Sequence, residues 1–147
     1  MWLAVAPVDM RSGADLTRFL TAQSSVIDRV LAELHAGYKE SHWMWFVFPQ
    51  LGALGRSATA RFYGIEDLEH ARRYLAHPVL GPRLLECTRA VLAHGDRTAH
   101  AIFGSPDDLK FRSCMTLFDL AGPQQPEFRQ ALERFYGGEP DPVTAGQ

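Results

Sequence analysis

The chain of 147 residues contains no asparagine, and only two of its 15 basic residues are lysines, Lys39 and Lys110. Where arginine supplies nearly every positive charge, a retained lysine indicates a role for a compact ammonium group with a tunable pKa. Cysteine is equally scarce. Cys87 and Cys114 form no C-x-x-C pair, so we expect reduced, partly buried thiols, as in a cytoplasmic protein.

Other absences exclude whole classes of protein. No apolar run is long enough to span a membrane, and Met1 to Val8 lacks the basic region of a signal peptide. The net charge of −2 gives no field that would attract nucleic acid, so nucleic-acid binding is disfavoured. No H-E-x-x-H motif is present, and His70 and His77 are wrongly spaced for two ligands on one helical face. We therefore expect no metal and no cofactor.

Apolar residues at helical spacing cover most of the chain and predict a mainly α fold. At this length we expect one compact domain of about five to seven helices over residues 15–137. An arm at 1–14 should precede it and a loose tail at 138–147 should follow. The first helix is predicted at 15–36, with Gly37 after its end.

The most unusual segment is K-E-S-H-W-M-W-F-V-F-P-Q, residues 39–50. Its apolar middle has no clear period, so residues 43–48 form either a short buried helix or a short extended element. Trp43 and Trp45 offer faces on which a planar ring can stack, and His42 can exchange protons near neutral pH. The alternative is that both indoles belong to the core and that the polar residues only cap the segment.

Three further places carry candidate groups. Gln23 lies in the apolar stripe of the first predicted helix, where it either ties down a loop or faces a ligand. Arg56 and Ser57 follow a glycine-bearing loop and can clamp a phosphate or carboxylate, unless they are solvated. A helix predicted to start at the S-P-D-D sequence, residues 105–108, mixes charges and hydroxyls. A surface ion pair with ordinary hydroxyl bonds to the helix is the alternative for this group.

Four blocks of sequence resemble a known family. They are R-F-L-T-A-Q at 18–23, the region 37–55 around S-H-W-M-W-F-V-F-P-Q, L-A-H-P-V-L-G-P-R-L at 75–84, and I-F-G-S-P-D-D-L-K-F-R-S-C-M-T-L-F at 102–118. These blocks are similar to bacterial proteins catalogued as domain of unknown function 1810, some of which are labelled calpastatin. The resemblance covers residues 15–144 and implies a mainly helical fold. Core and capping residues throughout argue against calpastatin-like disorder.

A weaker resemblance is to NADAR-type N-glycosidases, which remove ADP-ribose-type groups, and it indicates a substrate class only. We therefore expect a cytoplasmic protein that binds or hydrolyses a nucleotide-like ligand. The alternative is a non-enzymatic interaction module, for which the sequence leaves a homodimer open.

The expected catalytic residues are Glu40, His42, Asp107 and Asp108. A carboxylate would stabilise an oxocarbenium-like transition state or activate water, with His42 as the acid or base. The expected ligand-binding residues are Gln23, Lys39, Ser41, Trp43, Trp45, Gln50, Arg56, Ser57, Lys110, Arg112 and Ser113.

Overall fold

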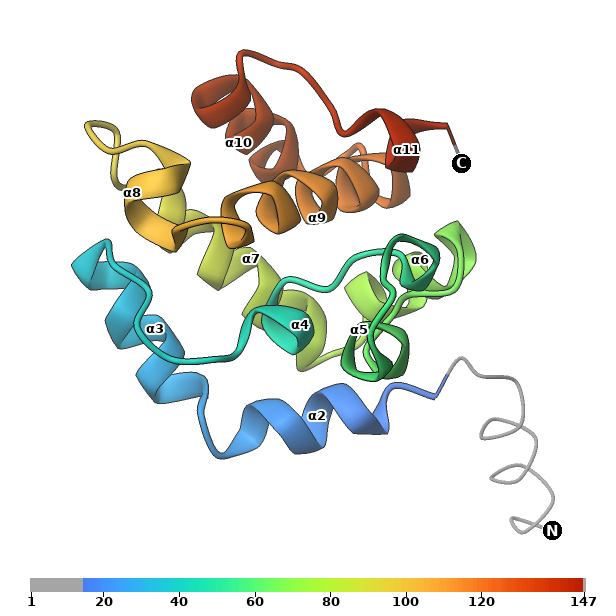
Figure 1. Ribbon diagram of the computed structural model, residues 1–147. Helices are drawn as coiled ribbons and strands as arrows, with labels where there is room; N and C mark the ends of the chain where they lie inside the picture. The colour runs from blue at the N-terminus through green and yellow to red at the C-terminus, as the bar shows by residue number, and fades with distance from the viewer. Residues whose placement is uncertain (1–14, 147) are drawn as a thin grey trace, which may run out of the picture.

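The computed structural model describes residues 15–146, and the structural statements below concern that part of the chain. The expected arm at 1–14 lies outside it. Within the described residues the chain is helical, and the one isolated parallel bridge joins Leu51 and Ile65 (Figure 1). The mainly α prediction is confirmed. In the same range, no helix combines the length and the apolar character needed to cross a membrane.

The helical elements follow one another along the chain with short connections. They are α2 (Thr17–Ser24), α3 (Ile27–Ala36), α4 (Met44–Val47), the 3-10 helix η2 (Gly52–Leu54), α5 (Ala58–Phe62), α6 (Leu68–Ala76), α7 (Leu80–Leu92), α8 (Ala99–Phe103), α9 (Asp107–Ala121), α10 (Pro126–Tyr136) and α11 (Pro142–Ala145).

Helix α9 is central to the packing. It contacts α6, α8, α10 and α11, while α7 contacts α3, α6 and α10 (Figure 1). Phe111, Met115 and Phe118 of α9 are fully buried. The ring of Phe111 meets that of Phe48 edge-on, with 4.9 Å between their centres. The core therefore joins the aromatic segment to the middle of α9.

The single helix predicted at 15–36 is wrong in one respect, because it is broken between α2 and α3. The break falls at Ser25 and Val26, which are weak helix formers. It lets Phe19 and Leu34, from the two halves, enter the same core. Gly37 ends α3 in the left-handed conformation (φ 77°), as predicted.

Residues 43–48 contain a helical turn, so the alternative of an extended element there is wrong. The Val47 and Phe48 amides donate to the carbonyls of Trp43 and Met44, each at 3.1 Å. The turn satisfies these backbone groups locally, where a buried extended segment would need a neighbouring strand. Pro49 follows directly and cannot continue the helix.

Residues 138–147 were expected to be loose, but this region contains α11, which packs against α9. The Asp141 amide donates to Thr116 Oγ1 at 2.9 Å. Arg112 donates through Nε and Nη2 to the carbonyls of the two residues before Asp141, at 2.9 and 3.0 Å. Side chains of α9 thus fasten a segment whose own composition predicts no strong helix.

Candidate functional site

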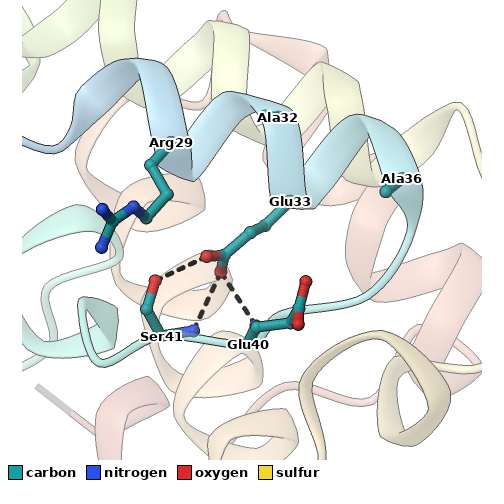
Figure 2. Close-up of a pocket in the computed structure, with 6 residues that line it drawn as sticks. All are labelled: Arg29, Ala32, Glu33, Ala36, Glu40 and Ser41. Carbon is teal, nitrogen blue, oxygen red and sulfur yellow. Dashed lines mark hydrogen bonds between the residues drawn. The ribbon is translucent and has the colours of Figure 1, made fainter.

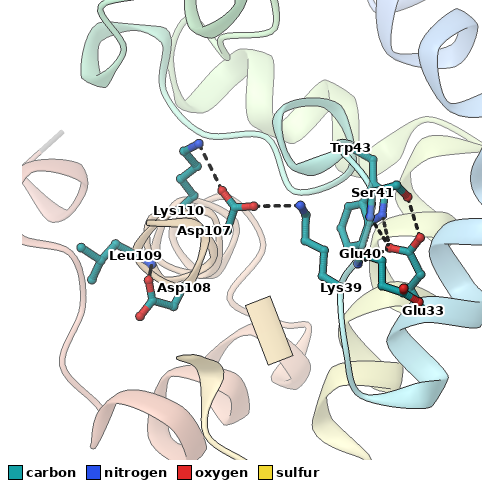
Figure 3. Close-up of polar contacts among 9 residues, drawn as sticks. All are labelled: Glu33, Lys39, Glu40, Ser41, Trp43, Asp107, Asp108, Leu109 and Lys110. Carbon is teal, nitrogen blue, oxygen red and sulfur yellow. Dashed lines mark hydrogen bonds and ion pairs between the residues drawn. The ribbon is translucent and has the colours of Figure 1, made fainter. Parts of the chain in front are cut away.

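Asp107, the first residue of α9, lies between the only two lysines of the chain (Figure 3). Its Oδ2 is 2.9 Å from Lys39 Nζ, and its Oδ1 is 3.2 Å from Lys110 Nζ. Lys39 belongs to the loop after α3, and only 8% of its side chain is exposed. A buried ammonium is strongly destabilising unless it is paired. One carboxylate therefore ties the aromatic segment to α9.

Each lysine also lies over an indole. Lys110 Nζ is 3.8 Å from the centre of the Trp45 ring, and Lys39 Nζ is 5.1 Å from that of Trp43. The environments of the two rings differ. Trp43 is only 2% exposed and belongs to the core, whereas Trp45 is half-buried. Of the two rings predicted to stack on a ligand, Trp45 is the one with accessible surface.

A pocket of about 420 Å³ opens beside Lys110, and we call it the α4–α9 pocket. Six expected ligand-binding residues line it: Trp45, Gln50, Arg56, Ser57, Lys110 and Ser113. The other lining residues are Leu54, Gly55, Ala60, Pro106, Leu109 and Asp141. The volume lies within the range of small-molecule sites, roughly 300–1,000 Å³. One aromatic face, two cations and several hydroxyl and amide groups thus share a single concave surface.

Hydrogen bonds to backbone carbonyls hold the loop that carries Arg56 in place. The Ile65 amide donates to the Gln50 carbonyl at 2.9 Å, and Arg61 Nη1 donates to the Arg56 carbonyl at 2.6 Å. Ser57 caps α5, its hydroxyl accepting from the amide three residues on. The Arg56 side chain is exposed. A fixed backbone with an exposed guanidinium suits recognition of a ligand anion.

Glu33 supports this region, and the sequence reasoning missed it. Its side chain is buried and accepts hydrogen bonds from the amides of Glu40 and Ser41, from the Ser41 hydroxyl and from the Trp43 indole (Figures 2 and 3). Burial alone would raise the pKa of Glu33, but these hydrogen bonds outweigh it and lower the pKa to about 2. The sequence does contain one indication of this role, because Glu33 is an acidic residue in the apolar stripe that includes Val30 and Leu34.

Five expected ligand-binding residues do not line the α4–α9 pocket and have structural partners instead: Lys39, Ser41 and Trp43, described above, and Gln23 and Arg112. Gln23 is 1% exposed, and its Nε2 donates to the Phe46 carbonyl at 2.7 Å and to the Tyr74 hydroxyl at 2.9 Å. It ties α2 to α4, which was the alternative interpretation of this amide. Arg112 binds the C-terminal segment, as described above, and does not line the α4–α9 pocket.

None of the four expected catalytic residues lines the α4–α9 pocket. Asp108 accepts from the Leu109 amide at 2.9 Å, and its side chain points away from that of Asp107 (Figure 3). His42 is exposed and does not line the pocket. Glu40 lines a second pocket of about 460 Å³, together with Arg29, Ser41 and the helix α3 (Figure 2). Asp107 alone adjoins the α4–α9 pocket, through its pair with Lys110.

Neither cysteine is placed for nucleophilic chemistry. Both thiols are free and buried, and burial raises the pKa of Cys87 to about 12 and that of Cys114 well above its ordinary value. Residues 15–146 contain no group of three or more His, Cys, Asp or Glu side chains that could hold a metal ion.

Fold and site together define a small all-α protein in which the α4–α9 pocket combines an aromatic ring with two cations. The family described as "Protein of unknown function (DUF1810)" matches residues 13–147, and the chain belongs to this family. It is also similar to the conserved hypothetical protein Rv1873 from Mycobacterium tuberculosis, whose crystal structure is known. The two are 51% identical with a TM-score of 0.88, over 90% of this chain and 94% of the other. Comparison with curated proteins gave no match.

Because of Glu33, the free energy of unfolding should fall as the pH drops from the ordinary pKa of a glutamate towards the lowered pKa of Glu33. Its pKa falls from an ordinary 4.5 to about 2 on folding, so the unfolded chain binds the proton more readily. The resulting stabilisation, about 3 kcal/mol, is fully present above the unfolded pKa and is lost as the pH falls towards the folded one. Glu33→Gln should remove it at neutral pH and flatten the dependence of unfolding free energy on pH at acid pH, as measured by urea denaturation.

Glu40→Gln is the matched control for Glu33→Gln, because the Glu40 side chain is exposed and makes no comparable set of bonds. It should leave both the stability and its pH dependence close to those of the wild type. Parallel acid profiles for wild type and Glu33→Gln would contradict the role given to Glu33.

Asp107→Asn should destabilise the protein more than Asp108→Asn does. The first change leaves the mostly buried Lys39 without its counter-charge, at a cost of about 3–5 kcal/mol. The second removes a charge from the same helix turn but keeps the bond to the Leu109 amide. Chemical denaturation measures both, and adding Lys39→Met to Asp107→Asn should recover part of the loss. Equal losses in the two Asn variants would show that the bridge contributes nothing.

Proposed function

We propose that this protein binds a small anionic ligand with a planar ring, of the nucleotide or ADP-ribose type, in the α4–α9 pocket. The observation that carries the proposal is that Trp45, Arg56 and Lys110 line one pocket although they come from three separate elements. Each supplies a different part of the recognition of such a ligand, and the volume suits a small molecule.

The two cations suit a phosphate group. Arg56 offers a planar guanidinium that can bind two oxygens at once, and Lys110 offers a compact point charge. The overall charge of the chain is −2, so attraction of an anion has to come from this local pair. Lys110 is already held in place by Asp107, which limits the entropy lost when it meets a ligand.

Trp45 suits the ring of the ligand. The Lys110 ammonium lies 3.8 Å from the centre of the Trp45 ring, so it covers part of one indole face through a cation–π contact. Stacking on an indole tolerates many ring types. The two contacts therefore favour a ligand that carries both a ring and an anion.

Binding has more support than hydrolysis. A catalytic acid or base must come within hydrogen-bond reach of the bond it acts on. Glu40, His42 and Asp108 do not line the pocket, and both oxygens of Asp107 are engaged by lysines. Of the expected catalytic residues, the N-glycosidase alternative thus retains only Asp107, which does not line the pocket but is paired with Lys110, as a fixed negative charge that would stabilise an oxocarbenium-like transition state. A pure interaction module, as an oligomer or with another protein, would leave the pocket unused.

Calorimetric titration with ADP-ribose, NAD and ADP tests this function. A ligand present at about 100 times its Kd should stabilise the protein by about 2.7 kcal/mol, visible as a higher Tm. Arg56→Ala and Lys110→Ala should each weaken binding by about tenfold or more, because a charge-assisted bond is lost. Trp45→Ala should weaken it similarly.

Arg29→Ala is the control, because it removes an arginine from the second pocket and leaves the α4–α9 pocket intact. The Arg29→Ala variant should bind the three compounds with the same affinity as the wild type. Two results would overturn the proposal: no binding of any of the three compounds, or a loss in Arg29→Ala as large as that in Lys110→Ala.

A further inference from the structure

Asp141 is the one carboxylate among the residues that line the α4–α9 pocket. It comes from the C-terminal segment, far along the chain from Trp45 and Arg56. No feature of its sequence surroundings singles it out. A negative charge in a pocket lined by Arg56 and Lys110 calls for an explanation, because it repels the anion that those two residues would attract.

Two side chains of α9 hold the backbone at Asp141. Its amide donates to Thr116 Oγ1 at 2.9 Å, and Arg112 holds the carbonyls of the two preceding residues. Thr116 and Arg112 both belong to α9, which also carries Lys110. The backbone at Asp141 is therefore docked on the helix that carries Lys110.

The orientation of the carboxylate is fixed as well. Oδ2 accepts from the Thr144 amide at 2.9 Å and from the Thr144 hydroxyl at 2.7 Å, which caps α11. In the described part of the chain, Oδ1 has no hydrogen bond. Asp141 thus binds its own helix through Oδ2, and the same residue lines the α4–α9 pocket.

An ionised carboxylate accepts hydrogen bonds and donates none. A ligand that satisfies Oδ1 must present a donor there, while its anionic part lies at Arg56 and Lys110. Ribose hydroxyls meet this requirement, and carboxylates bind the ribose 2′-hydroxyl in dinucleotide sites of other folds. An analogue that lacks the hydroxyl loses this charge-assisted hydrogen bond and therefore binds less tightly.

We infer that Asp141 is a specificity-determining residue that selects ligands carrying a ribose hydroxyl beside the phosphate. The inference rests on the proposed function and narrows it from nucleotide-like compounds to ribonucleotides. The C-terminal segment is then a wall of the binding site, which Arg112 and Thr116 fasten to α9.

Calorimetric titration with ADP and 2′-deoxy-ADP tests this selection on the full chain. The wild type should bind ADP about tenfold more tightly than 2′-deoxy-ADP, because one hydrogen bond to a charged group is lost. Asp141→Asn keeps an oxygen to cap α11 but removes the charge. In this variant the preference should fall several-fold, and inorganic pyrophosphate should bind more tightly because its repulsion is gone.

Thr144→Ala is the matched control, because it removes one bond to Oδ2 and leaves Oδ1 and the charge in place. It should keep the preference of the wild type for ADP. Equal binding of the two nucleotides by the wild type, or an unchanged preference in Asp141→Asn, would overturn the role of Asp141 while the pocket itself stands. Binding of neither nucleotide would overturn the proposed function together with this inference.

Discussion

The structure depends on one carboxylate shared by two ammonium groups. Asp107 holds Lys39, which is almost fully buried, and Lys110, which lies on the Trp45 indole. An unpaired charge at the position of Lys39 would be strongly destabilising, so this carboxylate fixes where the loop after α3 meets α9. The same contact brings the aromatic segment and the charged helix to the rim of one pocket. Stability and the layout of the candidate site are therefore set by the same residue.

A second carboxylate, Glu33, divides the aromatic segment into a structural and an accessible part. It binds the Trp43 indole and the backbone around Ser41, which commits Trp43 to the core. Two residues on, Trp45 turns outwards and lines the α4–α9 pocket. Glu33 and Asp107 hold the loop from opposite sides, through its backbone and through Lys39. An aromatic-rich segment that looks uniform in sequence thus has two different roles.

The helical class and the end of α3 at Gly37 could be predicted, because they follow from local periodicity and from a glycine that adopts the left-handed conformation. The S-P-D-D sequence indicated the region where α9 starts, but the predicted serine cap was wrong, because the helix begins at Asp107 after Pro106 and has no side-chain cap. The scarcity of lysine also pointed to Lys39 and Lys110, which the structure brings together. The break after α2 and the docking of α11 were not predicted, and for residues 43–48 the sequence left a helix and an extended element open. The packing of these segments depends on partners distant in the chain, such as Gln23 bonding to Phe46 or Thr116 bonding to Asp141. Glu33 was missed for the same reason, since its four donors lie beyond the end of its own helix.

The α4–α9 pocket is the place where we propose that a nucleotide-like ligand binds. The most direct measurement is backbone and indole NMR mapping during titration with ADP-ribose. The account predicts saturable shifts at the Trp45 indole and in residues 50–57 and 106–113, with little change around Arg29 and Glu40. Shifts confined to the pocket of Arg29 and Glu40, or no saturable shift at any ligand concentration, would contradict it.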